Sequence, residues 1–185
     1  MKRNTFLQLA LTAPLAGSVT RPEAATRDPK GFKVAVGEGR YHGPIQLKGV
    51  NQNVIRVKVS GRDTDGDLLL FEQTSLSPGR GTPMHVHPNQ DEVFTVLEGE
   101  YLFQVGEEKH RLKMGEAIFL PRKVPHAWTQ VSKRGKMMVL LQPAGHLEDF
   151  FVELAAFSHI PTPDEMARLF KKHDMEIVGP PLKID

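Results

Sequence analysis

From residue 32 onward, apolar and polar residues alternate in short runs, and each run ends near Gly, Pro, Asp or Asn. Alternation with a period of two is typical of β-strands with one buried face. The even spacing of the runs favours a sandwich or barrel over alternating strands and helices. The predicted strands cover residues 32–36, 54–59, 68–76, 92–99, 100–106, 109–113, 116–121, 126–131 and 136–143. Tight connections at residues 98–100 and 105–109 predict two hairpins and therefore antiparallel pairing.

The pattern changes to a helical period after Gly145. The spacing i, i+3, i+4, i+7 and i+8 predicts one helix that could lie on the barrel, with a stripe made of Leu147, Phe150, Phe151, Leu154 and Ala155. A second helix is predicted by the N-cap Thr162, by Pro163 at its first position and by Glu165 in a capping box. Its apolar face is made of Met166, Leu169 and Phe170. The glycine and prolines at 179–181 are expected to end regular structure.

The first 24 residues resemble a secretory leader peptide, because Lys2 and Arg3 precede an apolar stretch from residue 6 to about residue 19. Thr12 and Pro14 interrupt this stretch, so it is too short and too broken to cross a bilayer as an ordinary helix. The alternative is an amphipathic segment of a cytoplasmic protein. We predict a linker at residues 25–31, a β-barrel at 32–145 and a C-terminal helical extension at 146–185. One folded domain is expected, periplasmic or secreted if the leader is real and cytoplasmic otherwise.

Composition and charge exclude several classes of protein. The chain has no cysteine, which excludes a thiolate nucleophile, disulfides and cysteine-bound metal. The formal net charge is +2. Three basic residues and one acidic residue lie in the first 24 positions, so the remaining chain is neutral. A neutral domain offers no basic face for nucleic acid, and we expect neither a nucleic-acid partner nor a membrane partner for the mature form.

Two histidines and a glutamate form the first part of a candidate metal site. His85 and His87 are two residues apart, so an extended backbone would place both rings on one face of the sheet. Glu92 shares its face with Phe94 and Val96, and a carboxylate on an apolar face is costly unless a charge or a metal meets it. Taken alone, the histidines could be an exposed pair on a hairpin, and the glutamate a solvated strand end.

His126 supplies a fourth candidate ligand from a separate segment, at the start of a strand that continues with Trp128 and Gln130. Three imidazoles and one carboxylate suit one divalent transition metal (Fe, Mn, Ni, Cu or Zn), whereas calcium and magnesium prefer oxygen ligands. Four ligands leave two adjacent positions of an octahedron free for water, dioxygen or substrate, which is typical of a reactive metal. The spacing does not identify the metal.

These segments resemble the two motifs of the cupin superfamily. The first motif is matched throughout at Gly79, His85, His87, Glu92 and Gly99. The second is similar at Gly115, Pro121 and His126, with two departures: Lys123 stands where the family usually has glycine, and Gln130 where it often has asparagine. The resemblance is to the small single-domain type, and the C-terminal part is similar to extensions of quercetin-dioxygenase-like members. It implies an all-β fold, a double-stranded β-helix (jelly-roll) barrel with two C-terminal helices here, usually homodimeric, with the metal inside the barrel.

The resemblance favours a metal-dependent, dioxygenase-like oxidoreductase that acts on a small hydroxylated or enolic substrate. In this hypothesis Glu92 is both a ligand and the catalytic base that takes the hydroxyl proton. A redox-neutral isomerase or decarboxylase is the alternative, and it would need an anion anchor such as Arg56, Arg80 or Arg122. A small-molecule-binding protein without turnover is the third. Five residues are candidates for the substrate pocket, although a place in the barrel core is the more common role for each of them: Met84, Phe94, Phe103, Phe119 and Trp128.

Overall fold

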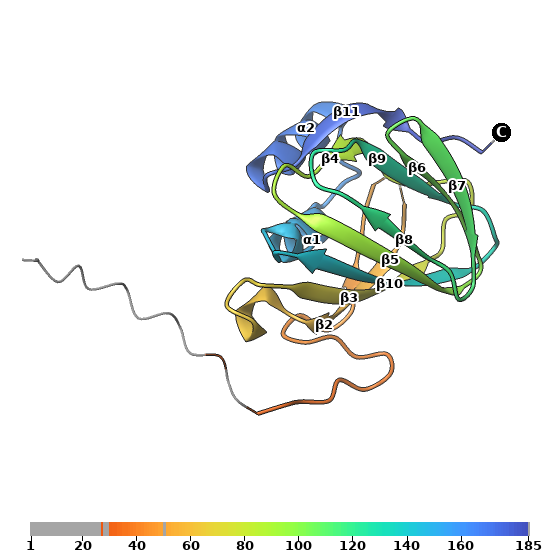
Figure 1. Cartoon of the computed structure of the whole chain (residues 1–185). Coiled ribbons are helices and arrows are strands. Elements are labelled where there is room, and N and C mark those ends of the chain that lie inside the picture. The colour runs from red at the N-terminus through yellow and green to blue at the C-terminus, as the bar shows by residue number, and fades with distance from the viewer. Residues whose placement is uncertain (1–26, 28–29, 50, 185) are drawn as a thin grey trace, which may run out of the picture.

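Two antiparallel β-sheets face each other and form most of the computed structural model, which describes residues 27, 30–49 and 51–184 (Figure 1). The six-stranded sheet has the order β1 (Ile45–Gln46), β2 (Val54–Val59), β3 (Leu69–Ser75), β10 (Gly135–Gln142), β5 (Asp91–Glu98) and β8 (Ala117–Leu120). The five-stranded sheet has the order β11 (Glu176–Pro181), β4 (Pro83–Val86), β9 (His126–Gln130), β6 (Glu100–Val105) and β7 (Glu108–Lys113). The predicted all-β barrel is confirmed.

Alternating burial along the central strands explains why these sequences pair as they do. On β3 and β10 every second residue is buried, and Val139 of β10 lies opposite Phe71 of β3 and Phe94 of β5. All three side chains are almost fully buried. Burying a side chain of this size contributes about 1.5–3 kcal/mol, and a shift of register by one residue would turn the whole apolar set toward solvent. The hydrophobic pattern therefore fixes the register.

The strand predicted at residues 32–36 is wrong, because no strand forms there. Val36 is 96% exposed, so the alternation of this run does not correspond to a buried face. The segment is held by side chains instead. Lys58 on β2 donates hydrogen bonds to the carbonyls of Ala35 and Glu38, and the Arg40 guanidinium lies 3.7 Å from the centroid of the Phe32 ring.

One of the two predicted hairpins is also wrong. Residues 98–100 connect β5 to β6, but these strands lie in different sheets, so this turn passes from one layer to the other. Gly99 has φ +82°, and a Cβ atom there would come within 2.3 Å of the Arg134 carbonyl oxygen. Only glycine fits this crossing. The hairpin at 105–109 is confirmed, because β6 and β7 pair with Val105 opposite Glu108.

Two helices follow the barrel, as the sequence predicts. They are α1 (Leu147–Ala156) and α2 (Pro163–Lys172), which lie at one end of the sheets (Figure 1). Thr162 caps α2 in a complete capping box with Glu165. The apolar stripe of α1 is buried, and Phe151 makes an edge contact with Phe71 of β3 at 5.1 Å between ring centroids. Both helices therefore belong to the same hydrophobic core as the barrel.

The C-terminal extension contains a strand as well as helices. Residues 179–181, expected to lie beyond regular structure, are part of β11, which pairs with β4 in an irregular antiparallel register. The two shifts of register lie on either side of Gly179, which is why alternation does not reveal this strand. The boundaries at 32, 145 and 146 stay predictions, and the predicted leader lies outside the described residues. Within the described part of the chain, no helix is long and apolar enough to span a membrane.

Candidate metal centre

The four predicted ligands come together, and they come from both sheets. His85 on β4 lies directly opposite His126 on β9 in the five-stranded sheet, and His87 follows the end of β4. Glu92 is on β5, in the six-stranded sheet. β4 and β5 are consecutive in the chain but lie in opposite layers. The cluster therefore bridges the interior of the barrel.

The geometry of the cluster suits a single ion. One ligand atom from each of the four residues lies within 4.8 Å of all the others, and all four residues are buried. The Glu92 carboxylate oxygen Oε2 lies 3.0 Å from Nε2 of His126 and 3.8 Å from Nε2 of His87. Ring centroids of His85 and His126 are 4.5 Å apart. Four donors around one point match the ligand number expected for a transition metal with positions left free.

Backbone contacts set the tautomers of two of these rings. Nδ1 of His85 lies 2.8 Å from the carbonyl oxygen of Pro83, and Nδ1 of His126 lies 3.0 Å from that of Val124. A carbonyl only accepts hydrogen bonds, so each Nδ1 carries the proton and each Nε2 carries a lone pair. Nε2 of His126 is buried and has no hydrogen-bond partner among the described residues.

That tautomer leaves the His126 lone pair 3.0 Å from a carboxylate oxygen of Glu92. Two electron-rich atoms at this distance repel each other unless a cation lies beside both. The two atoms are close, but they do not form a hydrogen bond. The residues present therefore fit a bound metal ion.

Burial and neighbouring charges put the side chains into metal-binding protonation states. Burial, together with the adjacent His126 and His87, lowers the pKa of His85 to about 3. Burial also lowers the pKa of His87. For Glu92, burial raises the pKa, but the attraction of the His87 ring, which is charged when protonated in acid, outweighs it and lowers the pKa to about 2. Neutral imidazoles and an ionised carboxylate are the forms that bind divalent metals.

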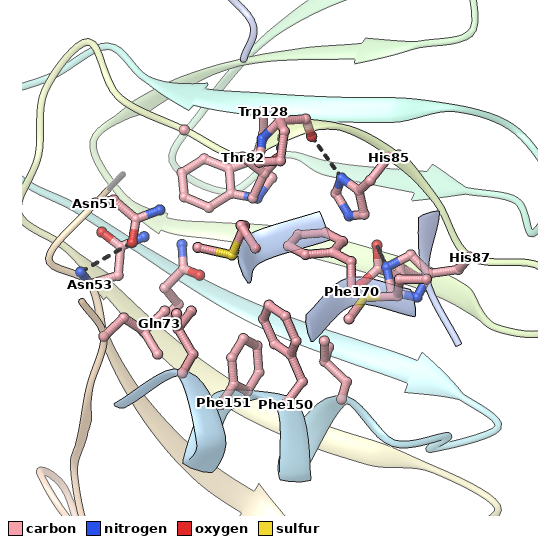
Figure 2. Close-up of a pocket in the computed structure, with 18 of the residues that line it drawn as sticks. Asn51, Asn53, Gln73, Thr82, His85, His87, Trp128, Phe150, Phe151 and Phe170 are labelled. Atoms are coloured by element: carbon pink, nitrogen blue, oxygen red, sulfur yellow. Dashed lines mark hydrogen bonds and ion pairs between the residues drawn. The ribbon is translucent and has the colours of Figure 1, made fainter. Parts of the chain in front are cut away.

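The cluster opens into a cavity that extends between the barrel and the helices (Figure 2). Its volume, counted as space open to the centres of water molecules, is about 90 Å³. One water needs roughly 10–15 Å³ on this measure, so a compact organic molecule fits. Aromatic side chains form much of the wall, and they are Phe71, Phe94, Trp128, Phe150, Phe151 and Phe170. Amides of Asn51, Asn53 and Gln73 form a polar side (Figure 2).

Of the five predicted pocket residues, Phe94 and Trp128 line the cavity and three do not. Phe119 on β8 is 57% exposed on the outside of the barrel. Phe103 is fully buried in the barrel core, 5.3 Å from Phe94 between ring centroids. Met84 packs instead against a separate small cluster that includes Leu102 and Leu182. It precedes His85 on β4, so it points to the opposite face.

The structure adds wall residues that the strand pattern could not supply. Phe150 and Phe151 come from α1 and Phe170 from α2, so the helices close over the metal cluster as well as covering the core. The sequence does place these three phenylalanines on the apolar faces of the predicted helices, which indicates an aromatic surface that could cover the barrel. Asn53, before β2, carries no such signal because its role depends on the fold.

The predicted arginine anchors lie elsewhere. Arg56 contacts Glu72 and donates to Thr74, and Arg122 pairs with Asp91 outside the cavity. Arg80 is exposed in a turn. Among the described residues that line the cavity, Lys48 and Glu92 are the charged ones. The described lining of the cavity therefore includes no arginine that could bind a substrate carboxylate or phosphate.

The departures from the cupin motifs leave the site intact. Lys123 has φ +67°, so the backbone keeps the left-handed conformation that glycine usually provides there. Its amide donates to the carbonyl of His87 at 2.8 Å. Gln130 is fully buried, and its side chain accepts a hydrogen bond from the Ser77 amide and donates one to the Ser132 carbonyl. It supports the loop before β4 and is not a ligand.

Comparison with known proteins finds similarity to cupin proteins over the strands of the barrel. Residues 73–142 match the family model described as Cupin domain. Quercetin 2,3-dioxygenase of Bacillus subtilis (strain 168) is 34% identical over 89 residues, which are 47% of this chain and 26% of that protein. Germin-like protein 3-5 of Oryza sativa subsp. japonica is 28% identical over 161 residues, 80% of this chain and 69% of that protein. An RmlC-like cupin structure from Shewanella frigidimarina NCIMB 400 aligns with TM-score 0.48 and 20% identity, covering 57% of this chain and 88% of that chain.

Fold and site together define a small antiparallel β-barrel protein with a candidate metal centre of nitrogen and oxygen ligands. The cupin match begins on β3 and ends at the last residue of β10, so it includes every strand that holds this centre. Residues 73–142 of the chain are similar to the cupin domain. The chain spans about a quarter of the length of the quercetin 2,3-dioxygenase that it resembles.

Proposed function

We propose that the protein is a divalent-metal-dependent, dioxygenase-like oxidoreductase that acts on a small hydroxylated or enolic substrate. One observation carries this proposal. The four-ligand cluster lies at one end of an aromatic cavity, and the described lining of that cavity includes no arginine. The aromatic wall of the cavity favours an uncharged, flat substrate. Such a substrate would bind the metal through one of its own oxygen atoms.

The chain's own residues supply binding and proton transfer. The aromatic walls hold the body of the substrate and exclude water from the cluster. Glu92 is the acidic residue among the described cavity-lining residues, so its carboxylate takes the proton when the substrate hydroxyl binds. A divalent metal held by His85, His87, Glu92 and His126 would stabilise the deprotonated substrate oxygen and, if redox-active, allow electrons to pass from substrate to dioxygen.

The redox-neutral alternative, an isomerase or decarboxylase, has weaker support. Its keto-acid or sugar-phosphate substrates carry an anion that needs a cationic partner. Lys48 is the one lysine or arginine among the described lining residues, and its ammonium group already donates to the carbonyl of Phe157. A role in ligand binding without turnover remains the third hypothesis, and oxygen uptake separates it from the first. Dimerisation and export stay predictions from the sequence.

An oxygen-uptake screen tests the proposal. The full chain is reconstituted separately with Fe, Mn, Ni, Cu and Zn, and each form is mixed with flavonols, catechols and β-diketones. We expect dioxygen consumption with at least one redox-active metal, none with zinc, and none for His87→Ala. His110→Ala, on the exposed strand β7, is the matched control and should keep full activity. Tight binding of these compounds without uptake under any metal would favour the third hypothesis.

A further inference from the structure

Asn53 is a buried amide whose side chain lacks a partner. The residue is 1% exposed, and neither Nδ2 nor Oδ1 makes a hydrogen bond to any described residue. Its backbone is satisfied, because the amide donates to Oδ1 of Asn51 and the carbonyl accepts from the amide of Leu47. Buried side-chain amides are nearly always hydrogen-bonded, so an unpaired one facing a cavity points to a ligand group.

Asn53 lies on the opposite side of the cavity from the metal cluster. Figure 2 shows Asn51, Asn53 and Gln73 on one side and His85 and His87 on the other, with the aromatic rings of α1 and α2 between them. Gln73 donates to the hydroxyl of Ser75, so part of its hydrogen-bonding capacity is already used. The cavity is therefore polar at two ends and apolar along its length.

We propose that Asn53 forms a distal subsite that binds a neutral hydroxyl or carbonyl group at the far end of an aromatic ligand, whose near end carries the metal-directed oxygen. The inference rests on the proposed function, because it takes the metal cluster as the site for the near end. A primary amide both donates and accepts, so either group can pair with it. A neutral group is favoured over an anionic one, since Lys48 is the one lysine or arginine among the described lining residues and its ammonium donates to the Phe157 carbonyl.

The ligand class follows from the two ends and the wall. A chelating enol or diketone at one end, one aromatic ring in the middle and a hydroxyl or acetyl group on the ring opposite the chelate satisfy all three regions. The distal group of the ligand contributes more to specificity than to affinity. A ligand without this group would leave the buried Asn53 amide unpaired.

Calorimetric titration of the zinc-loaded full chain with a matched pair of probes tests the subsite. Zinc is redox-inert, so neither probe is consumed. The probes are 1-phenylbutane-1,3-dione and its 4-hydroxyphenyl analogue, which differ only in the distal hydroxyl. We expect the hydroxylated probe to bind about 2- to 12-fold more tightly to the wild-type protein, the range of one net hydrogen bond.

Two variants and one control assign this difference to Asn53. Asn53→Leu keeps the branched shape of the side chain and removes its hydrogen-bonding groups. Asn53→Ser keeps a small polar side chain that is too short to reach the distal group of the ligand. Both should bind the two probes with equal affinity, close to that of the wild type for the unsubstituted probe. Gln142→Leu, which changes an exposed amide at the end of β10, should keep the wild-type ratio.

Equal binding of both probes by the wild-type protein, or an unchanged ratio in both Asn53 variants, would overturn the inference. Binding of neither probe would overturn it as well. Failure of the proposed function has a different signature, in which the probes bind zinc protein with the expected ratio but no metal form consumes dioxygen. His87→Ala should lose both probes together, which separates loss of the metal end from loss of the distal end.

Discussion

His126 shows at atomic scale why the cluster needs a cation. Its Nδ1 is committed to the Val124 carbonyl, and its buried Nε2 faces the Glu92 carboxylate at 3.0 Å. A metal ion removes this repulsion, so the affinity for the ion depends on the negative charge of Glu92 as much as on its shape. Replacing the carboxylate by an amide of the same size isolates the charge.

We therefore expect Glu92→Gln to lower zinc affinity at least tenfold, because changes outside the ligand set already cost 10- to 100-fold in some metal sites. Competition with a chromophoric chelator measures the change. Glu98→Gln, on the exposed end of the same strand β5, is the control and should bind zinc as the wild type does. Equal affinities for the two variants would contradict the ligand role of Glu92.

Lys123 has a backbone conformation that is unfavourable for any residue with a Cβ atom. Its φ of +67° is left-handed, and this costs a residue with a Cβ atom about 1–2 kcal/mol. Glycine removes that cost but loses about 0.5–1 kcal/mol of chain entropy on folding. Lys123→Gly should therefore raise the free energy of unfolding by roughly 0.5–1 kcal/mol in urea titrations. Lys133→Gly, at an exposed bend without positive φ, should not stabilise the protein.

Asp63 gives the protein an acid-sensitive contact. Arg40 first, with the Ser60 amide and the Tyr41 hydroxyl, lowers the pKa of this carboxyl from 3.8 to about 2 despite its burial. The Arg40 Nε lies 2.7 Å from Asp63 Oδ2. Because the folded pKa is the lower one, the stabilisation is fully present above about pH 4 and is lost as the pH falls toward 2.

Asp63→Asn should thus cost about 1–2 kcal/mol of unfolding free energy at pH 7 and much less near pH 2. Urea unfolding at several pH values measures the difference. Asp65→Asn is the control, since that side chain is exposed and asparagine also tolerates its φ of +52°. A penalty for Asp63→Asn that does not change with pH would show that packing, and not the ionised contact, is responsible.

At the scale of elements, α1 is pinned to the barrel by a buried carboxylate. Glu148 in its first turn accepts a hydrogen bond from the Ser60 hydroxyl at 2.6 Å and contacts Nε2 of His42 at 2.9 Å. Glu148 and Ser60 are both buried. This contact holds the helix that supplies Phe150 and Phe151 to the cavity wall.

Ser60→Ala leaves one oxygen of this carboxylate without its donor. Hydrogen bonds to charged groups are worth about 1.5–3 kcal/mol, and we expect a loss of that size in the free energy of unfolding. Hydrogen exchange should show faster opening of α1 than of β10 in the variant. Ser77→Ala, which removes an exposed hydroxyl contact to Gln52, is the control. Uniform loss of protection across all elements would contradict local pinning.

The strand pattern predicts most of the barrel but fails where alternation and strand pairing do not coincide. Residues 32–36 alternate without a partner strand, whereas β11 pairs without alternation, because Gly179 and its register shifts break the period. The turn at Gly99 reads as a hairpin because a local glycine does not say whether the next strand pairs or changes sheet. These three errors have a common cause. Each depends on contacts between residues that are far apart in the sequence, and a local pattern does not reveal such contacts.

The ligand set was predictable because four chemically distinctive residues carry it at fixed spacing. The cavity was not, because its wall depends on which strand faces point inward and where the helices lie. Phe94 and Trp128 line the cavity, whereas Phe119 lies on the outer face of the barrel. Asn53 could not be predicted at all, since an amide becomes a candidate subsite only when the fold leaves it buried and unpaired.

For the whole molecule, the candidate metal centre is a cross-link between two sheets. β4 and β9 contribute from one layer and β5 from the other, so an ion bound there ties the layers together. Ligands that bind only the folded state add about 4 kcal/mol when present at 1,000 times their dissociation constant. In a protein of this size that corresponds to roughly 8–16 °C in Tm.

Removal of the metal with a chelator, followed by dialysis, should lower Tm by that amount, and adding zinc back should restore it. Differential scanning calorimetry makes the measurement. His87→Ala should melt at the same temperature with and without zinc, while His110→Ala should respond as the wild type does. A Tm unaffected by metal in the wild-type protein would mean that the cluster holds no ion.

The pairing of β11 with β4 has a consequence for biosynthesis. β4 carries His85 and is made early, but the strand that flanks it leaves the ribosome only after the rest of the barrel and both helices. A nascent chain that ends before residue 176 has β4 as an open sheet edge beside two histidines. We therefore expect ribosome-bound intermediates that lack β11 to retain the ion poorly.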